Sequence, residues 1–493
     1  MNKKSSFIKG TFILVLAGIA ARIIGFFFRI FLSRTLGADG IGIYQLIFPI
    51  QGLCYAFCAA GIQTVISQQV AASVISNETS PRTILKCGMI LSFILSVLTA
   101  VTLYKNAGFI SSVLLSEKRC TVPLQYLSYS IPFSSIHTCI CGYYYGLNKA
   151  GIPAFSQFLE QIARVLATYC VWIILCRNGE VFSPTSAVIG AVAGELVSSA
   201  YCMYTLNVTR IHKPDISIIK NIARGSIPLT SNRLLLSVFQ SAEAILLPFF
   251  LRKSGMSSSD ALSIYGILTG MALPFIMFPA TITNAMSTLL LPAIAKADAG
   301  NNTEKIKLSS EKTIMISLIL GIFCTGIFYN YGNDIGLIIF NNKTSGYYLI
   351  ILAWLCPFLY LNTTLSSILN GLGHTTATFL FNILSIAIRI IFTIFAVPTL
   401  GISAYLCGIL VSQFILCLTQ YKNLLCYVHP DLHMADAIIL PVLLIFISEF
   451  LSDALCTLLR FNGLYMLMFC CVITSVLFFS GTYLFILKKD IDI

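Results

Sequence analysis

Charged residues are scarce in this sequence. They make up 10% of its 493 residues, and only 19 residues are acidic, whereas 57% are hydrophobic. A soluble domain needs a larger polar surface, so the composition excludes an ordinary soluble protein and is typical of a polytopic membrane protein.

Strand patterns of alternating polarity are absent, and so are long polar segments. Backbone groups in lipid must be hydrogen-bonded within their own segment, so each apolar stretch is expected to be a helix. We predict an all-α membrane protein with about fourteen transmembrane helices. The first is too long for a signal-peptide core and is expected to stay in the mature chain. The predicted spans are 7–33, 40–72, 84–104, 121–147, 153–176, 184–208, 222–251, 260–295, 312–330, 345–371, 374–398, 400–421, 435–456 and 463–487.

The chain has 17 cysteines, but it lacks the paired CxxC motifs that are typical of a zinc site. Most lie in apolar spans, such as Cys54 and Cys470, where they are expected to act as small hydrophobic residues rather than as a disulfide scaffold. His429 and His433 share one polar break without a further ligand nearby. The sequence therefore predicts no metal and no cofactor.

Signatures of catalysis are lacking as well. There is no DxD or P-loop motif, and no polar break is long enough for a nucleotide-sugar domain. We expect no catalytic residues, so the chain is not predicted to be an enzyme.

Lysine and arginine are distributed unevenly among the polar breaks. Successive breaks are expected on opposite sides of the membrane, so we grouped every second break, starting from the N-terminus. This group holds seventeen lysines and arginines, and the remaining breaks hold nine. The excess marks the cytoplasmic side, so both termini are predicted to be cytoplasmic. This bias accounts for most of the net charge of +12, so no nucleic-acid partner is expected.

The chain contains an internal repeat. Leu127–Leu147 matches Leu352–Leu372 at an offset of 225 residues, and the same offset places Arg164 on Arg389. Two copies with an even number of helices keep the same orientation, so a pseudo-twofold axis along the membrane normal is expected. We predict two six-helix lobes, 1–220 and 221–430, followed by two C-terminal helices in 431–493.

Five arginines lie within predicted spans, where each would cost about 2.5 to 3.5 kcal/mol if it faced lipid. They are Arg22, Arg29, Arg164, Arg233 and Arg389. All are expected to face protein or water, and all five are candidate substrate-binding residues.

Helix periodicity places several of these arginines on polar stripes. Gly18, Arg22, Gly25 and Arg29 recur at helical spacing. Two further stripes are predicted to line a cavity: Ser226, Thr230, Arg233, Ser237 and Gln240 form the first, and Asn382, Ser385, Arg389 and Thr393 form the second.

Some of these charges also have a structural interpretation. Glu160 precedes Arg164 by four residues, the favourable order for an ion pair within one helix. Glu160, Glu195 and Glu243 are candidate charge-pair or coupling acids. The small residues of "GYYYG" at Gly142–Gly146 and "GAVAG" at Gly190–Gly194 predict close helix contacts.

A cationic cavity favours an anionic substrate, and arginine is well suited to phosphate because its planar fork donates two parallel hydrogen bonds. The stretches "RIIGFFFRIFLSRTLGADGIGIYQLIFPI" at Arg22–Ile50, "AGIQTVIS" at Ala60–Ser67 and "SQFLEQIARV" at Ser156–Val165 resemble the stage V sporulation protein B family. That family belongs to the lipid II flippase branch of the multidrug/oligosaccharidyl-lipid/polysaccharide exporter superfamily.

This resemblance implies a flippase in the bacterial cytoplasmic membrane. Its substrate would be a polyprenyl-pyrophosphate-linked oligosaccharide or peptidoglycan precursor, moved by alternating access in spore or cell-wall synthesis. The expected partners are this anionic lipid-linked sugar, membrane lipid and cell-wall synthesis enzymes. Arg22 and Arg29 would line the cationic cavity, and the last two helices would hold the lipid tail.

Two alternatives remain open. A cation-coupled multidrug exporter of the same superfamily would need carboxylates in its N-terminal cavity, and the first helix has none. A non-transporting sporulation scaffold would tolerate neutral residues at Arg22 and Arg29.

Overall fold

A computed structural model describes residues 3–76, 80–206, 215–433, 435–459 and 463–484, with side chains described from residue 18 onward except at 75, 76, 458 and 459. All regular elements in these ranges are helices, as the composition predicted. Several basic residues used for the predicted orientation lie outside the described residues: Arg210, Lys213, Arg460, Lys488 and Lys489.

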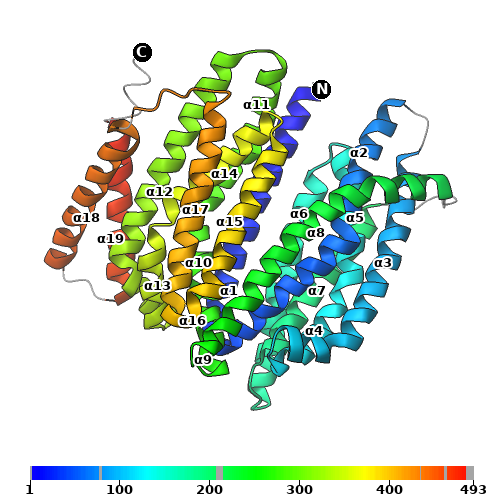
Figure 1. Cartoon of the computed structure of the whole chain (residues 1–493), viewed down its shortest axis with the longest axis horizontal. Helices are drawn as coiled ribbons and strands as arrows, with labels where there is room; N and C mark the ends of the chain where they lie inside the picture. The colour runs from blue at the N-terminus through cyan, green and yellow to red at the C-terminus, as the bar shows by residue number, and fades with distance from the viewer. Residues whose placement is uncertain (1–2, 77–79, 207–214, 434, 460–462, 485–493) are drawn as a thin grey trace. The chain divides into compact units, whose positions relative to one another are not determined.

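The chain divides into two compact units, Met1–Gly266 and Ile267–Ile493. The first unit contains α1 to α9 (Figure 1). Its elements are α1 (Lys3–Tyr55), the π-helix η1 (Ala56–Ala60), α2 (Gly61–Ser76), α3 (Pro81–Phe109), the π-helix η2 (Ile110–Leu114), the 3₁₀-helix η3 (Lys118–Cys120), α4 (Thr121–Ser128), α5 (Ser130–Gly146), α6 (Gly151–Arg177), α7 (Pro184–Thr205), α8 (Ile216–Lys253) and α9 (Ser258–Gly266).

The second unit continues to the C-terminal helices. Its elements are the π-helix η4 (Ile267–Ala272), α10 (Leu273–Met277), α11 (Ala280–Ala299), α12 (Thr303–Phe340), α13 (Lys343–Ala353), α14 (Cys356–Gly371), α15 (Thr375–Phe395), α16 (Val397–Leu400), α17 (Ile402–Leu425), the π-helix η5 (Ala435–Ile439), α18 (Leu440–Leu459) and α19 (Gly463–Thr482).

The number of membrane spans depends on how broken helices are counted. Within the described residues, eleven helices are long and apolar enough to cross a membrane, or up to twelve if the bent pair α13 and α14 is one span. The long α1 consists of two helices that meet at a kink at Gly37, whose φ of 69° favours glycine. The count of about fourteen stays a prediction.

Side-chain caps mark where several helices begin after a polar break. Asp215 accepts a hydrogen bond from the Ser217 N–H at 2.8 Å, and Asn302 accepts one from the Lys305 N–H at 2.9 Å. Asn342 caps α13 in the same way. These bonds satisfy N–H groups that the first helical turn leaves without a partner, so short polar breaks suffice to separate long apolar helices.

The core of the first unit is formed by α2, α3, α5, α7 and α8. Ile66, Val70, Cys87, Ile140 and Ile222 are fully buried in one cluster there. The second unit has its own core, between α11, α12, α14 and α17, around Ile294, Leu365, Ile368 and Leu424.

Glycines allow the closest helix contacts in the first unit. A Cβ at Gly142 would lie 2.6 Å from the carbonyl oxygen of Gln63 on α2. On α7, a Cβ at Gly190 would lie 1.8 Å from Oγ1 of Thr168, and one at Gly194 would lie 2.9 Å from the carbonyl oxygen of Glu160. The close contacts predicted for "GYYYG" and "GAVAG" are therefore confirmed.

The break before α4 is held by an ionic network. The Arg119 guanidinium donates to Glu117 at 2.9 Å and to Asp39 of α1 at 2.5 Å, and the Ser258 hydroxyl of α9 donates to Glu117 at 3.0 Å. Burial of Glu117 by itself raises its pKa, but the hydrogen bonds from Arg119 and Ser258 outweigh burial and hold the pKa below its ordinary value.

Helix ends in the two units repeat at the predicted offset. The short α4 ends at Ser128 and α13 ends at Ala353, whereas α5 ends at Gly146 and α14 at Gly371. Both differences are 225 residues. The lobe boundaries at 220 and 430 stay a prediction, because α8 packs on α2 and α3 within the first unit.

The following helices repeat a hydrogen bond as well. The Thr168 hydroxyl on α6 donates to the carbonyl oxygen of Arg164, and the Thr393 hydroxyl on α15 donates to that of Arg389. Both bonds measure 2.8 Å. The two arginines therefore occupy equivalent places in their own helices, as the sequence alignment predicted.

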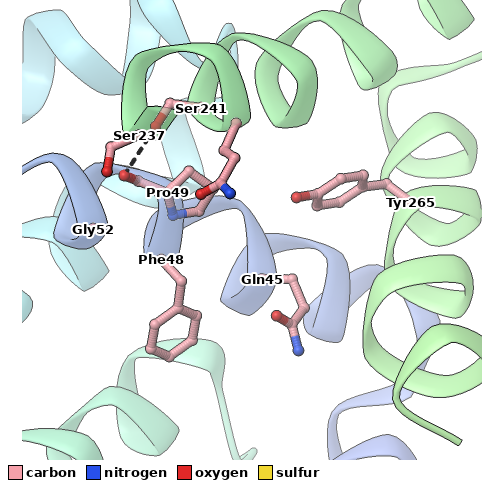
Figure 2. Close-up of a pocket in the computed structure, with 8 residues that line it drawn as sticks. Gln45, Phe48, Pro49, Gly52, Ser237, Ser241 and Tyr265 are labelled. Carbon is pink, nitrogen blue, oxygen red and sulfur yellow. Dashed lines mark hydrogen bonds between the residues drawn. The ribbon is translucent and has the colours of Figure 1, made fainter. Parts of the chain in front are cut away.

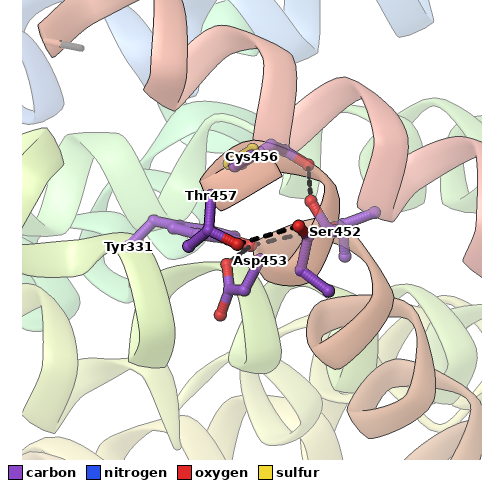
Figure 3. The surroundings of a disulfide bond; sticks show 8 residues. Tyr331, Ser452, Asp453, Cys456 and Thr457 are labelled. Atoms are coloured by element: carbon purple, nitrogen blue, oxygen red, sulfur yellow. Dashed lines mark hydrogen bonds between the residues drawn. A yellow bond between two sulfur atoms is a disulfide. The ribbon is translucent and has the colours of Figure 1, made fainter. Parts of the chain in front are cut away.

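The last two helices, α18 and α19, lie side by side and are joined by a disulfide between Cys456 and Cys470 (Figures 1 and 3). Ser452 donates to the carbonyl oxygen of Cys470 at 3.1 Å, and Tyr331 of α12 donates to Asp453 at 3.0 Å. The prediction that Cys470 is only a small hydrophobic residue was wrong. The packing of α19 against α18 brings the two sulfurs together, which residue spacing alone did not indicate.

Candidate cationic site in the first unit

Arg22 and Arg29 are exposed on α1, while Phe28 beside them is buried. Among the described side chains, no carboxylate lies within 4.0 Å of either guanidinium group. Two positive charges thus lie in a helix long and apolar enough to span the membrane, without neutralisation by the surrounding helices.

The face of α1 that carries Arg29 is directed at α6. A Cβ at Gly25, one turn earlier, would lie 3.7 Å from Oε1 of Gln161. Arg29 also interacts electrostatically with Arg164 on α6 and with Tyr44. Like charges placed this close repel each other, so this face has a positive potential that favours an anion.

Arg164 is neutralised within its own helix. Its Nη2 lies 2.5 Å from Oε1 of Glu160, and the two side chains are 21% and 13% exposed. This is the ion pair that the four-residue spacing predicted. Arg164 therefore contributes less free charge to the site than Arg22 or Arg29 does.

The polar stripe on α8 serves two purposes. At its first turns, Ser226 and Thr230 pack against α2, since a Cβ at Gly61 would lie 2.0 Å from Oγ1 of Thr230. The prediction that the whole stripe lines a cavity was therefore wrong for these two residues. Arg233 follows on the same helix, where it is exposed and interacts electrostatically with Tyr55.

The later turns of that stripe line a pocket of about 300 Å³ (Figure 2). Three helices contribute the lining residues: Gln45, Phe48, Pro49 and Gly52 from α1, Ser237, Gln240 and Ser241 from α8, and Tyr265 from α9. None of these side chains is charged. The pocket therefore offers amide, hydroxyl and aromatic groups for a neutral polar partner rather than an ion.

Pro49 shapes this pocket. Its ring nitrogen has no hydrogen and cannot donate to the carbonyl of Gln45, one turn earlier in α1. Its own carbonyl oxygen accepts a hydrogen bond from Ser241 at 3.0 Å, which ties α1 to α8 (Figure 2).

Arg389 lies half-buried on α15 in the second unit. Its neighbours on the predicted stripe serve helix packing: Ser385 is 2% exposed and donates to the carbonyl oxygen of Ser412, and Thr393 is fully buried. The prediction that Ser385 and Thr393 line a cavity was wrong, because hydrogen bonds within and between helices use their hydroxyl groups.

Of the three candidate acids, Glu160 is in the ion pair with Arg164. Glu195 lies on α7 with Oε2 at 3.8 Å from Nδ1 of His137, and Glu243 is buried on α8. The coupling role of these acids stays a prediction.

Comparison with known proteins identifies the family. The family described as polysaccharide biosynthesis protein matches residues 7–297, which is more than half of the chain. The chain belongs to this family. The MatE family also matches residues 237–395.

Relatives of this family member include the stage V sporulation protein B of Bacillus subtilis (strain 168). It is 26% identical over 81% of this chain and 80% of its own length. Among solved structures, lipid II flippase MurJ in an inward closed conformation matches with a TM-score of 0.74 and 14% identity, covering 97% of this chain and 99% of that one.

An inward-facing multidrug resistance transporter of the MATE family and the MOP superfamily matches with a TM-score of 0.64 and 15% identity, over 86% of this chain and 99% of that one. The polysaccharide biosynthesis family member described here is therefore a multi-pass membrane protein that shares the fold of these flippases and exporters.

The sequence of this family member carries little signal for most of the pocket. Gln45, Phe48 and Tyr265 are single residues in apolar runs, and no spacing separates them from other core positions. The available signals were the α8 stripe, which includes Ser237 and Gln240, and Pro49, a proline inside a span. The arginines are easier to find in the sequence, because a charge in an apolar run is conspicuous by itself.

Proposed function

We propose that the chain is a flippase that moves a polyprenyl-pyrophosphate-linked oligosaccharide or peptidoglycan precursor across the bacterial cytoplasmic membrane. One observation carries the proposal: Arg22 and Arg29 are exposed within a membrane-spanning helix, and no described carboxylate lies within ion-pair distance of them. Such charges are stable in a membrane when they meet water or an anionic ligand.

The chemistry of these side chains supports a pyrophosphate group. Each guanidinium can donate two parallel hydrogen bonds to phosphate oxygens, and the two positive charges together attract an anion. Arg233, exposed on α8, would contribute a third positive group.

The neutral pocket supports a sugar or peptide beside the phosphate. Ser237 and Gln240 of the pocket follow Arg233 on α8, and Ser237 lies about 6 Å further along the helix axis. Hydroxyl and amide groups there match the hydrogen-bonding groups of a glycan or a peptide stem.

The remaining parts of the proposal follow from the family resemblance. The two predicted lobes, 1–220 and 221–430, would alternate access to the site, and both termini would be cytoplasmic. Membrane lipid would contact the lipid tail, and cell-wall synthesis enzymes would be partners during spore or cell-wall synthesis. Binding of Arg389 to the substrate belongs to the same proposal.

The experiment that tests the proposal is complementation of a flippase-deficient strain. Arg22→Ala and Arg29→Ala should each lose complementation while insertion in the membrane stays normal, because the anion loses its partner. Arg177→Ala is the matched control: this arginine is exposed at the end of α6 and should keep full function. Full function in both α1 variants would show that these arginines do not hold the anion, whereas failure of the natural protein itself to complement would favour a non-transporting scaffold.

The alternative is a cation-coupled multidrug exporter, which the match of residues 237–395 to the MatE family favours. Mass spectrometry of lipids that co-purify in mild detergent separates the two. A polyprenyl-pyrophosphate species that is lost in Arg22→Ala supports the flippase, whereas a bound organic cation without such a lipid supports the exporter.

A further inference from the structure

Two thiols and an imidazole converge inside the first unit. His137, Cys141 and Cys202 each place one ligand atom within 4.8 Å of the other two. Their side chains are buried, with exposures of 7%, 4% and 0%. Such a trio of soft and borderline donors is the kind of set that binds a thiophilic metal ion.

The helices bring these residues together for simple geometric reasons. His137 and Cys141 are four residues apart on α5, so they occupy the same helix face. Helix α7 packs against α5 and supplies Cys202, and Ser198, one turn earlier on α7, lies 3.4 Å from Nδ1 of His137.

The imidazole of His137 is oriented by contacts at both nitrogens. Nε2 lies 2.9 Å from Oγ of Ser156, and that hydroxyl lies 3.8 Å from Sγ of Cys141, so Nε2 is on the side of the thiols. Nδ1 faces Oε2 of Glu195 at 3.8 Å. This oxygen is buried, and no described atom hydrogen-bonds to it.

This order of groups matches a known feature of metal sites. A histidine that binds a metal through one nitrogen commonly directs the other N–H to a carboxylate, which fixes the ring and its tautomer. Glu195 lies on the Nδ1 side of His137, where such a carboxylate would be, and the two thiols lie on the Nε2 side.

We propose that His137, Cys141 and Cys202 bind a thiophilic divalent cation of the zinc class. Nε2 and the two sulfurs would be three ligands, and the Ser156 hydroxyl, 2.9 Å from Nε2 and 3.8 Å from Sγ of Cys141, or a water molecule would supply the fourth. Binding releases the two thiol protons, and the two thiolates cancel the charge of the ion. A neutral site of this kind suits the interior of a membrane bundle.

Hard cations fit this position less well. Mg²⁺ and Ca²⁺ prefer several oxygen ligands. The carboxylates of Glu160 and Glu195 do approach His137, but Glu160 already pairs with Arg164 at 2.5 Å. The sulfur face of His137 is therefore the more complete site. A metal there would clamp α5 to α7.

The first test uses Co²⁺ as a spectroscopic substitute for zinc. The full-length protein would be purified in detergent, reduced, stripped with a chelator and titrated with Co²⁺. To avoid adventitious binding, the four exposed thiols would be replaced by alanine in the background protein. These thiols are Cys170, Cys176, Cys407 and Cys426.

The background protein should bind one equivalent of Co²⁺ with an intense near-ultraviolet thiolate-to-cobalt absorption. Cys141→Ser and Cys202→Ser should each lower the affinity at least tenfold, in line with loss of a metal ligand. Cys139→Ser, a buried cysteine on the same helix, is the matched control and should keep the signal. A signal that persists in Cys202→Ser, or none in the background protein, would overturn the proposal.

The second test does not depend on the folding of the variants. X-ray absorption at the zinc edge of the loaded background protein should show two sulfurs at about 2.3 Å and nitrogen or oxygen at about 2.0 Å. A shell of nitrogen and oxygen alone would refute the site, and so would a disulfide between Cys141 and Cys202 in peptides of the natural protein.

Discussion

Glu117 shows how one residue can hold a polar break together. It is 7% exposed and accepts hydrogen bonds from Arg119 and Ser258, so the folded protein stabilises the charged carboxylate. Because the folded-state pKa of Glu117 lies below its ordinary value of 4.5, this stabilisation is present above pH 4.5 and declines as the pH falls through the folded-state pKa.

We therefore predict that Glu117→Gln lowers the free energy of unfolding at neutral pH by roughly 1–2 kcal/mol. The effect is no larger because Arg119 is exposed and solvent screens its charge. The apparent Tm in detergent, measured between pH 3.5 and 8, checks this: the variant should differ from the natural protein at pH 7 and converge with it in acid. Glu180→Gln, at an exposed position, should have no effect. An equal Tm difference at all pH values would contradict this account.

The ion pair between Glu160 and Arg164 is a second residue-scale feature. Removal of either partner leaves a partly buried charge without its counterion. The stability losses of Glu160→Gln and Arg164→Met should therefore add up to more than the loss measured for the double variant. We expect a coupling of about 1–3 kcal/mol in a double-mutant cycle measured by unfolding in detergent. A coupling near zero would mean that solvent screens the pair.

At the scale of elements, contact between α5 and α2 depends on glycine. A Cβ at Gly142 would lie 2.6 Å from a backbone oxygen, and backbone cannot move aside as a flexible side chain can. The same is true of Gly146, whose Cβ would lie 2.6 Å from the carbonyl oxygen of Ser67. The two helices must therefore separate if either position gains a side chain.

Gly142→Ala should accordingly destabilise the protein by about 1–3 kcal/mol, measured as a lower apparent Tm. Gly108→Ala is a matched control on α3, because a Cβ there would have no neighbour within 4 Å. That variant should be neutral or up to about 1 kcal/mol more stable, since alanine favours helix. Equal Tm losses in both variants would argue against close packing as the cause.

At the scale of the whole molecule, the disulfide bears on orientation. Disulfides form on the oxidising side of a bacterial membrane. Cys456 and Cys470 join α18 to α19, and the distribution of basic residues predicts that the polar break between these helices is outside. The thiol Cys426, exposed at the end of α17, would then be inside.

Labelling of intact cells tests this orientation. An impermeant maleimide should modify Cys176, which is exposed at the end of α6 that is predicted to be outside, but not Cys426. Cys426 should react only once the cells are permeabilised. Reaction of Cys426 alone in intact cells would show that the predicted orientation is inverted.

The sequence by itself determined the membrane class, the helical content, the arginines within spans and the ion pair of Glu160 with Arg164. These follow from composition and from spacings of three or four residues, which a single helix converts into neighbours. The offset of 225 residues between the two copies was equally visible, because it is a property of order along the chain.

Only the tertiary structure decided which residues from different helices meet. It paired Cys456 with Cys470, brought Cys202 to His137 and Cys141, and divided the α8 stripe between packing at Thr230 and a pocket at Ser237. The physical reason is that rotation and crossing of packed helices depend on the fit of many side chains together. The spacing of residues within one helix carries no information about that fit.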